Sequence, residues 1–207
     1  YVDDNSSDDT EQKAKKFLKL FFDDKNYIFE KNNSRIGSLK SKYLSIHQHV
    51  SDNEIIVVLD GDDFFYTKFA LEYLNYIYSK KNILATYGSY LNLSGKINFQ
   101  KKYSNKTIKN KNFRKFFHPS HLRSYYAFIF KKIPKEQFVN SKKEFYKMCE
   151  DKATMFPIME LVGDQHYFIK YFLYCYNDIN PLNLNNRRDH LLQKQINEYE
   201  IRNKSIL

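Results

Sequence analysis

Three aspartates stand close together directly after the most apolar run of the chain. Asp60, Asp62 and Asp63 follow residues 55–59, which read IIVVL. Carboxylates placed this close repel one another unless a cation neutralises them. Hard divalent ions such as Mg²⁺ and Mn²⁺ prefer oxygen ligands and often keep a substrate phosphate in their coordination shell. These residue types therefore predict a Mn²⁺ or Mg²⁺ site that handles a phosphate-bearing ligand.

The residues before the aspartates predict the element that positions them. A continuous, β-branched apolar run is typical of a strand covered on both faces in a parallel sheet. In open α/β sheets, ligands bind beyond the carboxyl ends of the strands, which is where Asp60 and Asp62 fall. Gly61 keeps this loop slim, so that a diphosphate can approach closely. An ordinary Asp-rich turn is the alternative. An EF-hand calcium loop is excluded, because Phe65 stands where its sixth position needs glycine.

Helix and strand patterns alternate along the first half of the chain. Helical patterns cover residues 10–20, 38–49 and 68–79. Strand patterns cover residues 27–29, 55–59 and 83–90, and a turn at Ser94-Gly95 leads into residues 96–99. This alternation predicts an α/β fold with a mainly parallel sheet flanked by helices. We expect one domain over residues 1–180.

The second half of the chain has weaker patterns. Residues 100–115 are polar and lysine-rich, which favours a long surface loop, and residues 125–130 favour a strand. Residues 151–161 favour a helix that Pro157 kinks or restarts. Residues 181–207 favour a charged helix or tail after the domain.

The charge balance of the chain is strongly basic. Lysines and arginines outnumber aspartates and glutamates by 34 − 24 = 10, so the protein attracts polyanions. A nucleic-acid-binding module is one interpretation, but the sequence has no zinc finger and no aromatic, glycine-rich strand of the RNA-recognition type. The excess of Lys, Asn, Ile, Tyr and Phe is also what AT-rich codons favour. We therefore do not expect nucleic acid as the partner.

The cysteine count and the lengths of the apolar runs indicate in which cellular compartment the protein is located. Two cysteines are too few for a disulfide scaffold or a structural zinc site. No apolar run approaches the roughly 20 residues of a membrane-spanning helix. The N-terminus also lacks the basic and apolar regions of a signal peptide. These patterns favour a cytoplasmic location.

Two motifs in a fixed order resemble those of a known enzyme family. The first is YVDDNSSDDT, residues 1–10, and the second is VVLDGDD, residues 57–63. Separated by a helix, a strand and a helix, they resemble the signatures of family-two-type glycosyltransferases of the Rossmann-like GT-A fold. The resemblance implies metal-dependent, usually inverting transfer of a sugar from a nucleotide-diphosphate donor to a protein or glycan acceptor. A degenerate domain that binds without turnover is the alternative within the family.

The resemblance also implies donor-binding residues. By position, Asp3 or Asp4 would contact the nucleoside, with uridine and hence a UDP-sugar favoured. Arg35 and Lys40 lie where such enzymes meet the donor. Each of these roles follows from the place of the residue relative to the first motif.

The second motif would supply the metal site. The resemblance implies that Asp60 binds the ribose or metal-bound water and that Asp62 binds the metal itself. The cation would neutralise charge that builds up on the leaving diphosphate, which is the kind of electrostatic help that usually dominates catalysis.

An inverting transferase also needs a base to take the proton from the acceptor hydroxyl. The family usually supplies it from an acidic pair ahead of a helix, with a glycine further on. Glu150-Asp151 followed by Gly163 fits that layout, which favours Asp151. Glu160 is the rival because it is nearer to Gly163. For either carboxylate, stabilisation of the helix dipole is the structural alternative.

A histidine and arginine cluster follows the lysine-rich segment. Arg123 offers a bidentate donor for a diphosphate, and His121 could reach the donor or the metal. The segment HPSHLR, residues 118–123, resembles a stretch of a viral and microbial branch of these transferases. We expect donor-side roles for His121 and Arg123, with solvated loop residues as the alternative. For His166, an ordinary half-buried histidine is a better interpretation than a metal ligand.

The first motif begins at residue 1, which has a consequence for the sheet. In the GT-A fold, as the resemblance implies it, another strand precedes this motif and lies between its strand and the one ending at Asp60. We therefore expect a sheet that lacks its first strand, which would leave two rows of backbone groups unpaired. A longer parent protein or an interrupted gene, a sheet that closes up differently, and a strand from another chain are the three resolutions, of which we favour the first.

Overall fold

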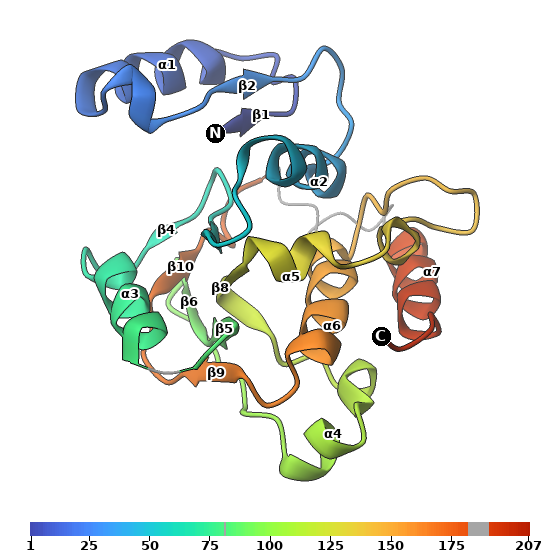
Figure 1. Ribbon diagram of the computed structural model, residues 1–207. Coiled ribbons are helices and arrows are strands. Elements are labelled where there is room, and N and C mark those ends of the chain that lie inside the picture. Colours follow the sequence, from blue (N-terminus) through green and yellow to red (C-terminus); the bar gives the residue numbers. More distant parts are fainter. Residues whose placement is uncertain (81, 182–190) are drawn as a thin grey trace.

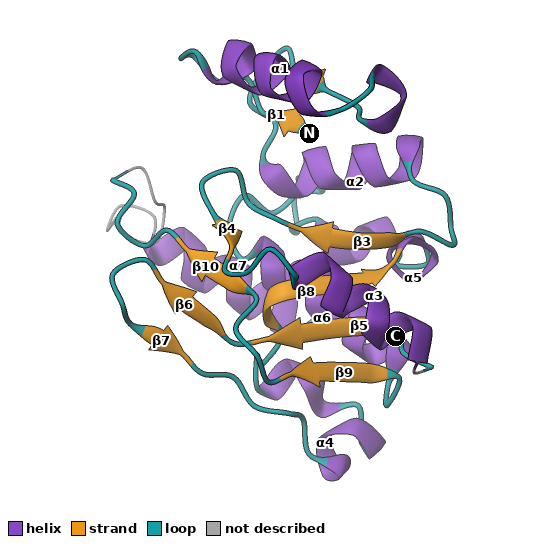
Figure 2. Cartoon of the chain, turned by 90° about the vertical axis from the view of Figure 1, so that its left-hand side faces the viewer, coloured by secondary structure: helices purple, strands orange, loops and turns teal. Residues whose placement is uncertain are grey.

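The computed structural model describes residues 1–80, 82–181 and 191–207. Its centre is a four-stranded sheet in the order β3-β8-β5-β9 (Figures 1 and 2). The strands are β3 Ile55–Val58, β8 Ser120–Tyr126, β5 Ala85–Gly88 and β9 His166–Ile169. β5 pairs in parallel with β9, and β8 runs antiparallel to both β3 and β5. Three of the four strands therefore share one direction, and only β8 opposes them.

Helices cover both faces of this sheet. Helices α6 Glu150–Val162 and α5 Ala127–Lys131 bury one face, and α3 Ala70–Lys80 buries the other. Successive strand side chains point to opposite faces. Strand β8 follows this rule, because Tyr125 packs in the cluster beneath α6 and Leu122 in the cluster beneath α3. The predicted α/β fold class is confirmed.

Two further helices complete the layer beside α6. Helix α2 Ser38–His49 contacts α5, and α7 Leu191–Arg202 contacts α6. The predicted C-terminal helix or tail thus contains a helix packed on the domain, while residues 182–190 lie outside the described residues. Among the helices that the structure describes, none combines the length and apolar character needed to cross a membrane.

A second four-stranded sheet lies beside the first. Its order is β4-β10-β6-β7, with β4 Phe64–Phe65, β10 Tyr174–Tyr176, β6 Tyr90–Asn92 and β7 Ile97–Asn98. Strands β6 and β7 form the expected hairpin, and Gly95 adopts the positive φ of +86° that its turn requires. The predicted strand 83–90 is thereby divided between β5 and β6, one in each sheet.

The lysine-rich segment is not the predicted surface loop. It folds into α4 Asn105–Lys109 and a 3₁₀ helix, Asn112–Lys115. Phe113 of this segment is fully buried and packs edge-on against Tyr103, with ring centroids 4.9 Å apart. Tyr103 and Arg114 of the same segment are buried as well, so the segment is attached to the core at three residues, which its composition did not indicate.

Three other predicted elements differ in extent. The predicted strand 125–130 ends at Tyr126, after which the chain enters α5. The predicted strand 27–29 is displaced to β2, Glu30–Lys31. Pro157 lies inside α6 without interrupting it, because buried packing along almost the whole helix outweighs the loss of one backbone hydrogen bond.

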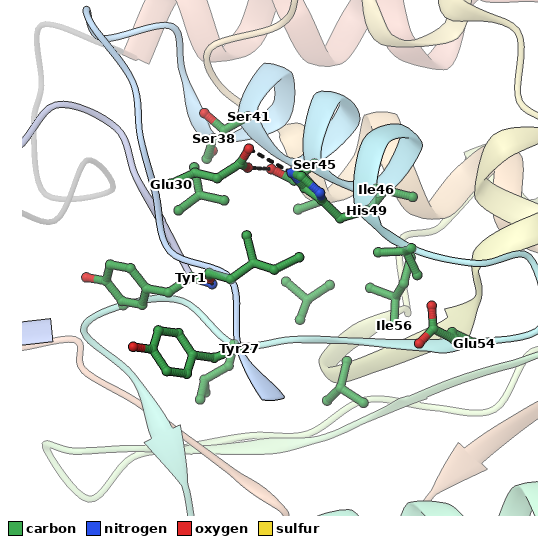
Figure 3. A pocket seen from close by; sticks show the side chains of 18 of the residues that line it. Tyr1, Tyr27, Glu30, Ser38, Ser41, Ser45, Ile46, His49, Glu54 and Ile56 are labelled. Atoms are coloured by element: carbon green, nitrogen blue, oxygen red, sulfur yellow. Dashed lines mark hydrogen bonds and ion pairs between the residues drawn. The ribbon is translucent and has the colours of Figure 1, made fainter. Parts of the chain in front are cut away.

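The N-terminal segment forms a small unit of its own. Strand β1 Val2–Asp3 pairs in parallel with β2, and α1 Thr10–Phe21 connects them. Within the described residues, β1 does not join the central sheet. A cavity of about 740 Å³ lies between β1 and β3 instead, lined by both (Figure 3). This gap is where the sequence predicted an absent strand.

Candidate active site

Several segments of the chain line a cavity of about 510 Å³, and three of them supply the residues that the sequence predicted for the site. The loop after β3 contributes Asp60 and Asp62, and strand β8 contributes His121 and Arg123. The first turn of α6 contributes Asp151. The cavity lies beyond the carboxyl end of β3 and gathers side chains that are far apart in the sequence.

Asp63 anchors the aspartate loop instead of facing the cavity. Its buried carboxylate accepts hydrogen bonds from the hydroxyl of Tyr174 at 2.5 Å and from the backbone N–H of Asn177 at 2.7 Å. Burial, together with the neighbouring carboxylates of Asp62 and Asp60, raises the pKa of Asp63 above its usual value. The loop is thereby fixed to strand β10, which sets the positions of the other two aspartates.

Asp60 and Asp62 are left with accessible carboxylates. The Asp60 side chain is 38% exposed, and Asp62 is exposed. Asp62 accepts one hydrogen bond from Asn180 Nδ2, at 2.6 Å. Both line the cavity, so both present oxygen atoms to whatever occupies it.

Arg123 lies between two of the cavity's carboxylates. Its Nη2 atom is 4.0 Å from Oδ2 of Asp60, and its Nη1 atom is 4.0 Å from Oδ2 of Asp151. Only 5% of the residue is exposed, and its Nε atom has no hydrogen-bond partner among the described residues. Burial opposes the charge, but Asp151 and Asp60 outweigh it and raise the pKa of Arg123. The arginine is therefore a fixed cation at the base of the cavity.

The imidazole ring of His121 contacts the guanidinium group of Arg123. This ring stacks on Tyr174 with centroids 4.2 Å apart, and Tyr90 meets it edge-on at 5.3 Å. Both ring nitrogens lie 3.3 Å from Nη2 of Arg123. Burial, then Arg123 and Lys42, lower the pKa of His121 well below its ordinary value, so the ring is neutral near pH 7. A neutral ring can accept from the guanidinium, which favours the observed arrangement.

Asp151 stands in the first turn of α6, half-buried at the cavity wall. Its Oδ1 atom accepts a hydrogen bond from the backbone N–H of Lys152 at 2.8 Å, and its Oδ2 atom faces Arg123. The positive end of a helix favours a carboxylate at this position. Asp151 thus combines a position at the start of a helix with access to the cavity.

Comparison with known proteins identifies the family. Residues 1–138, which form two thirds of the chain, match the family model described as Glycosyl transferase family 2. The chain belongs to this family. No curated protein sequence matches the chain.

Solved structures agree on the fold of this family 2 chain. It is similar to the crystal structures of S. aureus TarS and of S. aureus TarS 1-349, each with a TM-score of 0.60 and 16% sequence identity over 85% of this chain. The chain spans 30% of the first structure and 50% of the second. At this identity the likeness concerns the fold alone, which is the GT-A fold.

Glu160, the rival base of this family 2 domain, lies away from the cavity. It is 1% exposed, and its Oε1 and Oε2 atoms accept hydrogen bonds from Nε and Nη2 of Arg114 at 2.5 and 2.8 Å. Arg114 also donates to the backbone carbonyl of Ile201, which fastens the end of α7. A carboxylate held in this buried pair does not line the 510 Å³ cavity, which favours a structural role.

Asp4 ties β1 to the segment before α2. Its carboxylate accepts hydrogen bonds from the backbone N–H groups of Ile36 and Gly37, both at 2.9 Å, and from Asn32 Nδ2 at 2.8 Å. Burial alone would raise its pKa, but these hydrogen bonds outweigh burial and lower it. Asp4 also lines the 740 Å³ cavity, and so borders a space that is large enough for a ligand.

The 740 Å³ and 510 Å³ cavities are neighbours. Ser38, Asp60 and Gly61 line both of them. Asp3 lines neither cavity, because its side chain is buried and accepts a hydrogen bond from the backbone N–H of Ser6 at 2.9 Å. Of Asp3 and Asp4, only Asp4 lines one of these two cavities.

Arg35 and Lys40 lie in a different place from the other predicted donor residues. Both line a third cavity, of about 400 Å³, together with Lys147. Neither borders the cavity that holds Asp60 and Asp62. The structure thus separates the two cations from the aspartates with which the sequence had grouped them.

Sequence reasoning missed the aromatic support of the site. The hydroxyl of Tyr174 bridges the aspartate loop, since it donates to Asp63 and accepts from the backbone N–H of Asp60 at 3.4 Å. Tyr174 and Tyr176 lie in an apolar, aromatic stretch whose pattern predicts only burial. His166, by contrast, is an ordinary buried histidine whose Nδ1 atom bonds the carbonyl of Gly163.

Proposed function

We propose that this chain is the donor-binding and catalytic domain of a glycosyltransferase that moves a sugar from a UDP-sugar to an acceptor hydroxyl with inversion, aided by Mn²⁺ or Mg²⁺. One observation carries the proposal: Asp60, Asp62, Arg123 and Asp151 come from three distant segments and line a single cavity. Membership of glycosyl transferase family 2 supports the reaction class.

The two neighbouring cavities suit the two ends of such a donor. The nucleoside occupies the end of the 740 Å³ cavity beside Asp4, and the diphosphate and sugar occupy the 510 Å³ cavity. Asp60 stands at their junction, where it can accept hydrogen bonds from the ribose. The buried charge of Arg123 then attracts the diphosphate from beneath.

The residues present fit a divalent ion that is completed by its substrate. Among the described residues, no three His, Cys, Asp or Glu side chains converge on one ion position. Mg²⁺ is typically held by one or two carboxylates plus substrate phosphates, and Asp62 with Asp60 offers that number. When bound, the ion would neutralise charge on the departing diphosphate.

Asp151 is the base in this proposal. It accepts the proton of the acceptor hydroxyl as the acceptor oxygen bonds to the anomeric carbon and the bond from that carbon to the diphosphate breaks. Arg123, whose Nη1 atom is 4.0 Å from Oδ2 of Asp151, orients this carboxylate at the cavity wall. Asp151 therefore acts on the acceptor, and Arg123 positions it.

Ligand-dependent melting of the purified protein tests donor binding. UDP with Mn²⁺ should raise the melting temperature, and a nucleic-acid binder would respond to an oligonucleotide instead. A panel of nucleotide sugars, followed by release of UDP with Mn²⁺ present, then tests turnover. Stabilisation by UDP without hydrolysis or transfer of any donor would indicate a domain that binds only. No response to UDP and Mn²⁺ at all would contradict the proposal.

A further inference from the structure

The 400 Å³ cavity beside the candidate active site is strongly basic. Five cations, one carboxylate and two apolar side chains line it: Arg35, Lys40, Lys135, Lys143, Lys147, Glu144, Ile36 and Phe145. They come from the segment around the start of α2 and from the stretch that precedes α6. Lys147 also lines the 510 Å³ cavity, so the two spaces adjoin.

The positive charge of this cavity is offset only in part, by Glu144 in its lining and by Asp4, which interacts electrostatically with Arg35. Within the part of the chain that the structure describes, none of the five cations forms an ion pair. Lys42 and Lys152, which lie close by on α2 and α6, do have partners, in Glu150 and Glu198. A cavity lined by five cations and one carboxylate attracts anions.

We propose that this basic cavity binds a phosphate group of the acceptor while the acceptor hydroxyl lies at Asp151. This inference rests on the proposed transferase function. The 740 Å³ cavity, in which we place the nucleoside, shares no lining residue with the basic cavity, and the 510 Å³ cavity shares only Lys147 with it, among the described residues. Lys147 closely precedes α6, which carries Asp151, so an anion held here approaches from the side of the base.

The donor groups of the cavity suit phosphate. Arg35 offers a planar fork that bonds two oxygen atoms at once, and four ammonium groups act as point charges around it. A phosphate ester presents three such oxygen atoms in a compact group. The proposal therefore assigns Arg35 and Lys40 to the acceptor, although the sequence grouped them with the donor.

The test uses the double variant Lys135→Gln/Lys143→Gln, which changes no residue of the donor cavities. The matched control is Lys16→Gln/Lys19→Gln, which removes the same charge from exposed positions of α1. Inorganic tripolyphosphate is titrated calorimetrically into each protein in metal-free buffer, with citrate as a carboxylate probe. We expect the first variant to bind tripolyphosphate about tenfold more weakly and the control within about twofold of the parent, because only the first loses charges that face the cavity.

Each other outcome of the titration overturns the proposal. Equal weakening in both double variants would mean a general attraction to a basic protein. Unchanged binding in both would mean that the phosphate lies elsewhere. Citrate bound as tightly as tripolyphosphate would mean a site for any polyanion, with no preference for phosphate.

Donor hydrolysis, with water as acceptor, separates this inference from the proposed function. Lys135→Gln/Lys143→Gln should release UDP from the donor as fast as the parent protein, while transfer to a phosphorylated sugar acceptor falls relative to the same sugar without phosphate. If the parent protein neither hydrolyses nor transfers any donor but tripolyphosphate binding still depends on Lys135 and Lys143, the transferase proposal fails and the anion site remains. If hydrolysis is intact and both acceptors respond equally to the substitutions, the phosphate proposal fails.

Discussion

The Nη1 atom of Arg123 lies 4.0 Å from Oδ2 of Asp151, and this approach connects strand β8 to the first turn of α6. The same guanidinium faces Asp60 through its other terminal nitrogen. One buried cation thereby links the carboxylate that would meet the acceptor to a carboxylate that would meet the donor. Substitutions of Asp151 and of Asp60 should consequently affect different steps, the first the reaction of the acceptor and the second the binding of the donor.

Asp151→Asn should separate binding from transfer. The amide keeps the shape of the side chain but cannot take a proton, so transfer should fall by about 10²-fold or more. Affinity for UDP with Mn²⁺ should stay close to that of the parent protein. Steady-state transfer rates together with UDP titration check both parts. If Glu160→Gln abolishes transfer in a folded protein while Asp151→Asn does not, the base is misassigned.

Asp62→Ala should abolish metal-dependent donor binding and leave the fold intact. The side chain is exposed, and its one hydrogen bond to a described residue is with Asn180, so little stability depends on it. The readout is the rise in melting temperature that Mn²⁺ adds to the effect of UDP. Asp52→Ala, at an exposed aspartate that pairs with Lys131 away from the cavities, is the matched control. Mn²⁺-dependent binding that survives in Asp62→Ala would remove this residue from the metal site.

The buried pair of Arg114 and Glu160 should matter for stability. Glu160→Gln leaves the guanidinium buried without its counter-charge, and breaking one partner of a buried pair typically costs about 3–5 kcal/mol. Urea denaturation followed by tyrosine fluorescence measures this loss. The double variant Arg114→Met/Glu160→Leu should recover much of it, because no unpaired charge remains. A stable Glu160→Gln with slow transfer would instead restore Glu160 as a catalytic candidate.

The patterns that predicted the site are local ones. The apolar run before Asp60 correctly predicts a strand whose carboxyl end carries the aspartates. The burial on both faces in a parallel sheet that it also predicts is not found, because β3 pairs with β8 in antiparallel fashion and only Val58 of its residues is buried. Asp151 is likewise placed by a helix start that the sequence marks with two acidic residues. These positions depend on a few neighbouring residues, so a single sequence is enough to predict them.

The contacts that the sequence could not supply are long-range. Nothing near Tyr174 in the chain indicates that its hydroxyl bonds Asp63, which is 111 residues away. Phe113 is one aromatic residue within a run of lysines, and its burial depends on Tyr103 and the core beneath α6. The cavity that Arg35 shares with Lys147 depends on how two distant segments pack. Contacts between residues this far apart in the sequence depend on the tertiary structure, and the local sequence pattern does not predict them.

Asp4 should make the free energy of unfolding depend on pH in the acidic range. Its pKa is lowered in the folded protein, so the ionised carboxylate stabilises the fold fully above the ordinary value of 3.8, and this contribution is lost as the pH falls below it. Asp4→Asn removes this contribution at all pH values. Because the lost hydrogen bonds are to a charged group, the free energy of unfolding near pH 7 should fall by about 2 kcal/mol. Urea midpoints of both proteins between pH 3 and 7 should therefore converge at the acid end. A difference that stays constant down to pH 3 would contradict this account.

The last prediction concerns the edge of β3 that faces the 740 Å³ cavity. The hydrogen-bond pattern between β3 and β8 determines which backbone groups of β3 face that cavity. The backbone N–H of Ala127 donates a hydrogen bond to the carbonyl of Glu54 at 2.9 Å. Two and four residues further along β3, Ile56 lies opposite Tyr125 and Val58 lies opposite Arg123. Hydrogen-bonded residues alternate along an antiparallel ladder. The N–H groups of Ile56 and Val58 therefore point to β8.

The N–H groups of Ile55 and Val57 then point away from β8, into the cavity that separates β3 from β1. We expect amide hydrogen exchange in this chain to be about 10²-fold faster at Ile55 and Val57 than at Ile56, because exchange protection follows hydrogen bonding and burial. A segment that pairs with this edge, from the same gene product or from another chain, should slow exchange at those two amides and leave Ile56 unchanged. Equal protection of Ile55, Ile56 and Val57 in the monomeric chain would instead mean that the sheet has closed on itself and needs no further strand.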